Sequence, residues 1–308
     1  MKVSLEASYA ACRRASRKSA SNFLLSFWFL PREKRQAMYA LYAFFRHTDD
    51  LGDNGGDTTQ RQADLDAWRY QLQAALAGEF HDVRLPAVVD TLRKFDIPPQ
   101  YLEQSIQGVE TDLYPRQFEN YEQLRNYCYQ VASVVGLSCI RIWGLRDDID
   151  LQPATDCGYA FQLTNILRDL REDALSGRVY LPSDELEAFG VTREMLTSGS
   201  DSEEFRALMR FQIARARDLF QSAERLTPSL HEDGRKIFTA MMSIYRNLLD
   251  RIAEDPEAVL HRRVRVSSWR KVKLLTSLAF SQLVPAPTLE PAPSINPTPR
   301  PEKVRHVV

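Results

Sequence analysis

Two sets of oxygen-bearing side chains in this sequence recur at the spacing of one helical face. Asp49 and Asp53 stand four residues apart, and Asn165, Asp169 and Asp173 follow one another at the same step. On an α-helix, residues four apart lie along one edge, separated by about 6 Å along the axis. Like charges repel at this distance, so that such an edge needs solvent or a cation beside it.

The first set alone has a simple explanation, because acidic surface helices are common and a solvated helix end needs no ligand. Asp50 adds charge to this segment, but it is rotated by about 100° from Asp49 and points elsewhere. The second set favours a site. Leu163, Ile166 and Leu167 offer apolar surface that would hold their helix in a core. We therefore expect the acidic edge of this helix to face an internal cavity.

Two acidic edges on two helices predict a magnesium clamp for a diphosphate. Mg²⁺ takes oxygen ligands in near-octahedral geometry and is usually shared between carboxylates and substrate phosphates. Five ligands on two helices cannot all surround one ion, but they suit several ions that bridge a diphosphate. Arginines beside both edges can neutralise phosphate oxygens directly. These arginines are Arg46, Arg168, Arg171 and Arg178.

Aromatic side chains close to the first acidic set indicate the other half of such a site. Tyr39, Tyr42, Phe44 and Phe45 would line an apolar pocket, although core packing explains each of them singly. A dry aromatic cavity shelters a carbocation from water, and metal ions stabilise a departing diphosphate. The residues therefore indicate ionisation of a diphosphate ester whose remainder is a hydrocarbon.

The elements that must position these residues are helices. The chain has 308 residues with only 12 glycines, and its apolar residues recur mainly at helical spacing. One helix can begin at Pro31, which suits a first helical turn, and end before Gly55 and Gly56. The further helices that we expect cover residues 59–77, 86–95, 99–112, 120–143, 153–174, 203–225, 231–254 and 267–283. Nothing marks an interior linker, so that the sequence predicts one all-α domain over residues 1–283.

The last segment has a different composition. Residues 284–308 hold seven of the chain's 16 prolines, and proline cannot donate to backbone hydrogen-bond ladders. We expect a disordered tail with local polyproline II character. A docking segment for a proline-recognising partner is the alternative.

The bulk composition excludes several functional classes. A formal net charge of -1 gives no electrostatic footprint for nucleic acid. The four cysteines form no CxxC pair, which argues against a zinc site and suits a reducing compartment. No apolar run approaches the roughly 18 residues of a spanning helix, and no secretory signal is visible. We expect a cytoplasmic protein without a transmembrane segment, with room for peripheral membrane contact during product release.

The candidate residues lie in blocks that resemble the squalene/phytoene synthase family of head-to-head prenyl transferases. The blocks are "SASNFLLSFWFLPREKRQAMYALYAFFRHTDDLGD", "NYCYQVASVVGL", "AFQLTNILRDLREDALSGRVYLP" and "YRNLLDRI". The third block is the most specific, and the resemblance covers roughly residues 15–275. The residues of these blocks are most similar to those of bacterial presqualene diphosphate synthases.

The resemblance implies an isoprenoid-synthase fold with a central cavity between the two acidic motifs, and it implies roles for individual residues. The metal ligands would be Asp49 and Asp53 on one wall, with Asn165, Asp169 and Asp173 on the other. Catalytic and diphosphate-binding roles would fall to Tyr42, Arg46, Tyr127, Gln162, Arg168, Tyr245, Arg263 and Arg265. Substrate contacts are further implied at Ser21, Asn22 and Phe23, although many family members carry serine where Asn22 stands.

The activity that the resemblance implies is the Mg²⁺-dependent head-to-head (1'-1) condensation of two farnesyl diphosphates to presqualene diphosphate, with release of diphosphate. Phytoene synthesis from geranylgeranyl diphosphate, or squalene or dehydrosqualene synthesis, is the alternative. A non-catalytic helical assembly factor is a remote one. NADPH use is left open. The sequence has no glycine-rich dinucleotide motif, but this family does not use one, so that the absence of the motif does not exclude NADPH. Prenyl diphosphates are the expected ligands, and downstream isoprenoid enzymes are candidate partners.

Overall fold

The structure is a computed structural model, and it describes residues 3–18, 23–53, 55–114, 117–146 and 149–265. All regular elements in these ranges are helices, which confirms the predicted all-α class. The helix expected at 267–283 and the proline-rich tail at 284–308 lie outside the described residues.

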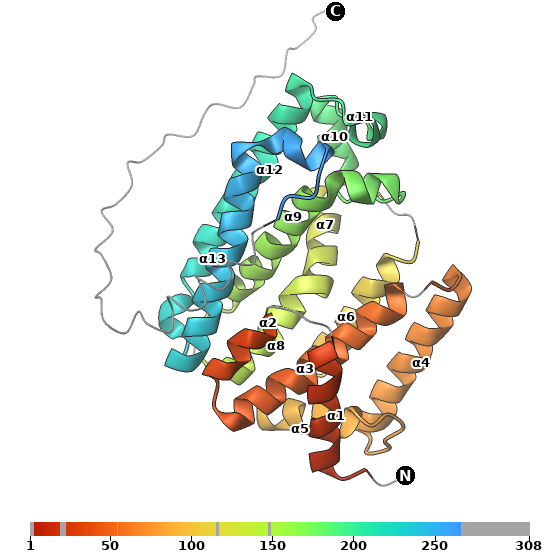
Figure 1. Ribbon diagram of the computed structural model, residues 1–308, viewed down its shortest axis with the longest axis vertical. Helices are drawn as coiled ribbons and strands as arrows, with labels where there is room; N and C mark the ends of the chain where they lie inside the picture. The colour runs from red at the N-terminus through yellow and green to blue at the C-terminus, as the bar shows by residue number, and fades with distance from the viewer. Residues whose placement is uncertain (1–2, 19–22, 54, 115–116, 147–148, 266–308) are drawn as a thin grey trace, which may run out of the picture.

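Helices follow one another along the whole described chain (Figure 1). The α-helices are α1 (Leu5–Lys18), α2 (Phe23–Ser26), α3 (Arg32–Asp53), α4 (Thr58–Leu76), α5 (Leu85–Lys94), α6 (Gln100–Thr111), α7 (Tyr121–Cys128), α8 (Val134–Trp143), α9 (Gln152–Leu175), α10 (Ser183–Phe189), α11 (Arg193–Ser198), α12 (Glu203–Glu224) and α13 (Glu232–Glu254). Shorter elements are the 3₁₀ helices η1 (Phe27–Phe29), η3 (Thr227–Ser229) and η4 (Pro256–Leu260), and the π-helix η2 (Tyr129–Ser133). The helices expected between residues 31 and 254 begin and end within one residue of their predicted bounds.

The sequence pattern does not predict α1, α10 and α11. Helices α10 and α11 are too short to show a helical period, and they end at Gly190 (φ 68°) and Gly199 (φ 74°) in the left-handed region. Helix α1 buries Ser8, Cys12 and Ser16, so that its inner face consists of small residues. Such a face gives no apolar stripe in the sequence, so that α1 is recognised only from its packing against the neighbouring helices.

The long helices lie side by side. Figure 1 shows them in order from α4 at one side of the molecule through α6, α8 and α9 to α12 and α13 at the other. Helix α3 begins directly after Pro31 and buries Met38, Leu41 and Phe45, while α9 buries the leucine and isoleucine face that the sequence indicates. None of the described helices is long and apolar enough to cross a membrane.

A π-helical turn, η2, joins α7 to α8 without a break. Such turns are rare and occur frequently at functional sites. Glycines let two neighbouring helices approach this turn closely. A Cβ atom at Gly158 of α9 would lie 2.4 Å from the Cα atom of Ser133, and one at Gly108 of α6 would lie 2.6 Å from a methyl carbon of Val131. These close approaches fix α6 and α9 against η2.

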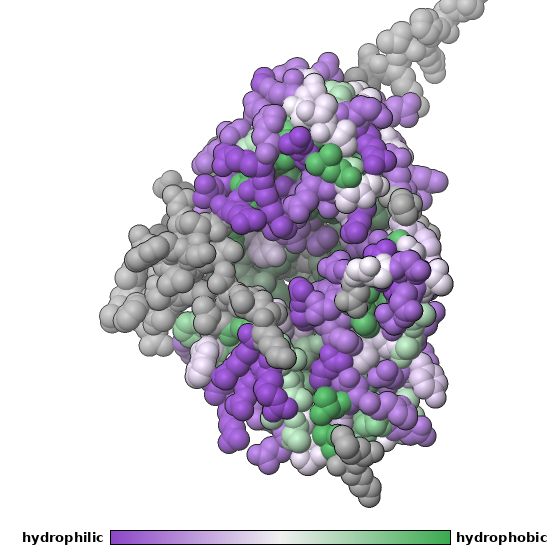
Figure 2. All heavy atoms as spheres, turned by 45° about the vertical axis from the view of Figure 1, so that its right-hand side comes forward, coloured by the Kyte–Doolittle hydropathy of each residue, from purple (hydrophilic) through white to green (hydrophobic). Residues whose placement is uncertain are grey.

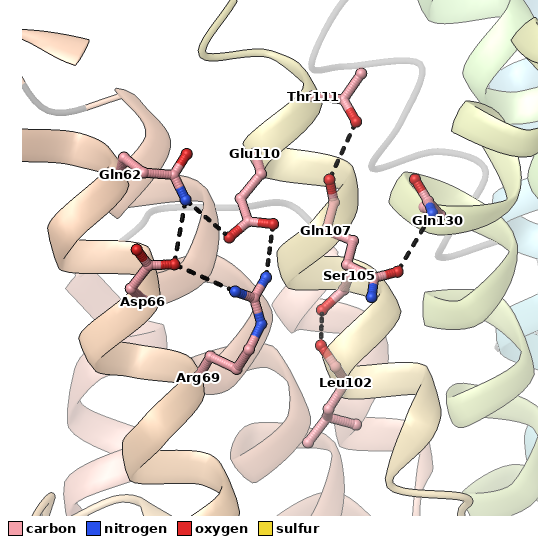
Figure 3. A network of polar contacts seen from close by, with 9 residues as sticks. All are labelled: Gln62, Asp66, Arg69, Leu102, Ser105, Gln107, Glu110, Thr111 and Gln130. Atoms are coloured by element: carbon pink, nitrogen blue, oxygen red, sulfur yellow. Dashed lines mark hydrogen bonds and ion pairs between the residues drawn. The ribbon is translucent and has the colours of Figure 1, made fainter. Parts of the chain in front are cut away.

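A polar network joins α4 to α6 (Figure 3). The guanidinium of Arg69 contacts Glu110 at 2.6 Å and Asp66 at 3.2 Å. The Gln62 amide donates to Glu110 at 3.2 Å, so that two side chains of α4 hold one carboxylate of α6. Because Arg69 and Glu110 are partly buried, this pair fixes the C-terminal half of α6 more firmly than an exposed ion pair would.

Replacement of Gly158 by alanine should lower the free energy of unfolding by about 1–3 kcal/mol, because the added methyl group meets the backbone of Ser133. Gly136→Ala is the matched control, since a Cβ atom at this helical glycine has no neighbour within 4 Å among the described residues. Alanine there should stabilise the protein by up to about 1 kcal/mol. Chemical denaturation measures both changes, and equal stability of the two variants would contradict the close approach.

Candidate active site

An apolar cavity of about 390 Å³ lies between α3, α6, α8, α9 and α13. Its size is that of a small-molecule pocket, and its wall is mainly hydrophobic with a few polar groups, as is usual for such sites. Arg46 and Asp49 of α3 and Gln162 and Asn165 of α9 supply charged and amide groups to the wall. The face of the molecule in Figure 2 is mainly hydrophilic and is hollowed near its middle, where hydrophobic residues lie at depth.

The first acidic set occupies the last two turns of α3. Asp49 is open to the cavity but surrounded by protein, and the partial loss of hydration raises its pKa to about 7. Arg46 opposes this rise, whereas the negative charges of Asp53, Asp50 and Asp112 add to it. Asp50 contacts Arg46 at 2.6 Å. The middle aspartate of this segment therefore positions the arginine, and its two neighbours are left for a cation.

The second acidic set runs along α9 from the cavity outward. Asn165 lines the cavity, and its buried Oδ1 atom accepts no hydrogen bond of ordinary geometry from the described residues. The Tyr245 hydroxyl approaches Asn165 without meeting that geometry. Asp169, one turn further, is held by the guanidiniums of Arg168 at 2.8 Å and Arg263 at 2.9 Å. The amide oxygen of Asn165 therefore lacks a donor among the described residues, whereas Asp169 is paired with two cations.

Asp112 links the two acidic sets, and no pattern in the sequence points to it. Its negative charge contributes to the raised pKa of Asp49 and to that of Asp173, which loss of hydration raises to about 7. The Tyr127 hydroxyl donates to one Asp112 oxygen at 3.0 Å, and the Tyr180 hydroxyl donates to the other at 2.8 Å. A single aspartate at a helix end carries no periodic signal, so that only the packing of α6 against α3 and η2 reveals its place.

Seven of the residues that the sequence predicts for the site meet in the cavity wall, and Phe45 is one of them. The other six are Tyr42, Arg46, Asp49, Gln162, Asn165 and Tyr245. Asp53, Asp169, Asp173 and Arg168 lie on α3 and α9 beyond the cavity wall. Arg263 reaches the site through its contact with Asp169. The structure thus brings the two acidic sets to one end of the cavity.

The structure places three of the candidate aromatic side chains away from the cavity wall. Tyr39 and Phe44 are buried in the core, because only residues at the spacing of Tyr42 and Phe45 share the cavity face of α3. Tyr127, which the resemblance places at the reaction centre, is buried beside the cavity with its hydroxyl engaged.

The remaining candidates stay predictions. Arg265 is exposed. Ser21 and Asn22 lie outside the described residues, and so does the side chain of Phe23, whose backbone begins α2.

The donor atoms at the charged end of the cavity suit Mg²⁺ that a diphosphate helps to hold. No three His, Cys, Asp or Glu side chains in the described ranges come close enough to hold a metal ion by themselves. Mg²⁺ in phosphate sites usually takes one or two carboxylates and completes its shell with phosphate oxygens and water. The orphaned Oδ1 atom of Asn165 and the raised pKa values of Asp49 and Asp173 are features that a cation would relieve.

Comparison with known sequences agrees with this geometry. The family model for squalene/phytoene synthase matches residues 16–270. A 15-cis-phytoene synthase from Synechococcus elongatus is 37% identical over 282 residues, which cover 88% of this chain and 92% of that protein.

Two solved structures are similar over most of the chain. The crystal structure of a dehydrosqualene synthase in complex with a ligand is 31% identical, covers 90% of this chain and 96% of its own, and gives a TM-score of 0.79. The crystal structure of squalene synthase HpnC from Alicyclobacillus acidocaldarius is 29% identical, covers 82% of this chain and 96% of its own, and gives a TM-score of 0.76. The fold is therefore the isoprenoid-synthase fold, and the chain belongs to the squalene/phytoene synthase family of prenyl-transferring enzymes.

Proposed function

We propose that this protein joins two geranylgeranyl diphosphates head to head to give phytoene, with loss of both diphosphates and of two protons. The observation that carries this choice of substrate is the relation to a 15-cis-phytoene synthase over 88% of the chain. The residues of the sequence blocks favour farnesyl diphosphate and presqualene diphosphate instead, but the similarity to the phytoene synthase extends well beyond these blocks. The cavity supports the reaction class, because carboxylates stand at one end of an otherwise hydrophobic wall.

The charged end of the cavity is the proposed site of ionisation. The side chains that would hold Mg²⁺ are Asp49, Asp53, Asn165, Asp169 and Asp173. When bound, Mg²⁺ would neutralise the charge that develops on the departing diphosphate. Arg46, which Asp50 positions, and the two arginines on Asp169 would bind phosphate oxygens directly.

The apolar part of the cavity would protect the cation that ionisation leaves behind. Phe45 lines the wall one turn before Asp49, and Tyr42 lines it two turns before Asp49, so that aromatic faces lie close to the site of bond cleavage. The hydrophobic wall excludes water that would otherwise trap the cation. Tyr127 does not line this wall; it donates a hydrogen bond to Asp112 and thereby holds that carboxylate beside the two acidic sets.

A second candidate is the same coupling of two farnesyl diphosphates, to presqualene diphosphate or dehydrosqualene. The observation that favours it is the similarity to the solved dehydrosqualene and squalene synthases, at 31% and 29% identity. Squalene itself would further require NADPH as a reductant. The two candidates share every proposed residue role. They differ in the length of the prenyl chain and, where presqualene diphosphate is the product, in whether the second diphosphate leaves.

Product analysis distinguishes the two candidates. The purified protein with geranylgeranyl diphosphate and Mg²⁺ should give phytoene, without NADPH and with two diphosphates released per product. Farnesyl diphosphate is tested in parallel, with and without NADPH, and products are identified by mass. If the protein turns over farnesyl diphosphate but not geranylgeranyl diphosphate, the second candidate replaces the first. If neither substrate releases diphosphate, both candidates are contradicted.

Removal of one proposed metal ligand should abolish most activity without loss of the fold. We expect Asp53→Asn and Asp169→Asn each to lower kcat/KM by on the order of 100-fold or more, because the departing diphosphate loses part of its stabilisation. Asp64→Asn on the exposed side of α4 is the control and should keep wild-type activity. Thermal unfolding checks that all three variants are folded. Wild-type turnover in either ligand variant would exclude the metal clamp.

The Mg²⁺ requirement should depend on pH. Asp49 and Asp173 have pKa values of about 7 without metal, so that each is mostly protonated at about pH 6 and mostly ionised at about pH 8. Because Mg²⁺ must displace these protons, its half-saturating concentration should rise by about tenfold or more from pH 8 to pH 6. Turnover measured against Mg²⁺, corrected for binding to free substrate, gives this value. A constant requirement over the range would contradict the assignment of these two carboxylates.

A further inference from the structure

We propose that Trp143 forms the floor of the cavity and sets the greatest length of prenyl chain that the site accepts. This inference rests on the proposed function in one respect, namely that a prenyl chain enters the cavity with its diphosphate at the charged end. Four helices define the direction of the cavity independently of one another, and all four place Trp143 at the opposite end.

Helices α3 and α9 give the depth. On α3 the wall runs from Asp49 at the charged end back to Met38, and on α9 it runs from Asn165 back to Ala154. In each stretch the two end residues are eleven positions apart, which corresponds to about 16 Å of helix. Both helices therefore carry their charged and amide groups at one end of the cavity and only apolar groups at the other.

Helix α13 runs along the same cavity. Tyr245 approaches Asn165 at the charged end, and Phe238 lines the wall two turns earlier. One turn before Phe238, a Cβ atom at Gly234 would lie 2.3 Å from the Cβ atom of Trp143. The start of α13 is thus packed directly on Trp143, at the end of the cavity away from the acidic sets.

Helix α8 ends at this floor. Its cavity face includes Cys139 and Ile140 and finishes with Trp143, the last residue of the helix. The carbonyl oxygen of Trp143 accepts a hydrogen bond of 2.8 Å from Lys34, which lies one turn before the apolar end of the α3 wall. Lys34 also contacts Asp233 at 2.8 Å. Three helices therefore converge on the backbone of Trp143, so that the residue cannot easily move aside.

The indole ring suits a fixed apolar floor. Trp143 is only 4% exposed although it lines the cavity, and its Nε1 atom is buried without a hydrogen-bond partner among the described residues. Replacement by a smaller apolar side chain therefore removes bulk from the floor without breaking a hydrogen bond. A chain that is too long would have to press its last carbons against this ring. Hydrophobic pockets discriminate a single added carbon by about tenfold to 200-fold.

The test is binding of a series of non-ionising analogues. The S-thiolodiphosphates of farnesyl, geranylgeranyl and farnesylgeranyl alcohols are titrated by calorimetry with Mg²⁺ into the full chain and into Trp143→Phe, Trp143→Leu and Trp143→Ala. We expect the wild type to bind less tightly beyond one chain length. The ratio of the affinity for that longer analogue to the affinity for the preferred analogue should rise by at least about tenfold in Trp143→Leu and Trp143→Ala, and by less in Trp143→Phe.

Phe205→Leu is the matched control, because Phe205 is fully buried in the same core but does not line the cavity. It should leave the chain-length profile unchanged. An unchanged profile in Trp143→Phe and Trp143→Leu, or an equal shift in Phe205→Leu, would overturn the proposal, as would equal affinity of the wild type for all three analogues. Because the readout is binding, it is independent of turnover, and a failed coupling reaction with an intact length profile would count against the proposed function alone.

Discussion

Negative charge gathered at one end of an apolar cavity is the constraint on which the rest of this structure depends. Asp112 lies near enough to Asp49 and to Asp173 for its negative charge to raise the pKa of both, and the surrounding protein removes part of the hydration of all three. Such a cluster is costly unless cations approach it. Two arginines already offset the charge of Asp169. The other carboxylates require further cations, which Mg²⁺ bound together with a prenyl diphosphate would supply.

The same helices that carry the charge also form the hydrocarbon part of the cavity. Helices α3 and α9 are charged toward one end of the wall and apolar toward the other, so that the site matches a molecule with a charged head and a long apolar chain. The helices of the cavity wall are held in place by close contacts at glycines, where an added Cβ atom would clash. Gly158 and Gly108 bring α9 and α6 onto η2, and the Arg69–Glu110 pair holds α6 from the other side.

Periodicity in the sequence predicts the helices and the two acidic sets well, because both depend on residues three or four apart on one helix. It predicts less where two elements meet. Asp112 gains its place only when α6 packs against α3, and Tyr180 reaches it from a loop 68 residues further on. Tyr39 and Phe44 have the composition of a pocket wall but face the core, since their composition does not tell which side of α3 faces the cavity. The small buried residues of α1 give no apolar period at all.

The central claim is that these carboxylates hold divalent cations together with a diphosphate rather than alone. Electron paramagnetic resonance of Mn²⁺, used as a substitute for Mg²⁺, tests it directly when the protein is titrated with and without inorganic diphosphate. Free Mn²⁺ should fall strongly only when protein and diphosphate are both present, beyond the binding of Mn²⁺ to diphosphate itself. Equal Mn²⁺ binding with and without diphosphate, or none beyond that of diphosphate in solution, would contradict the account.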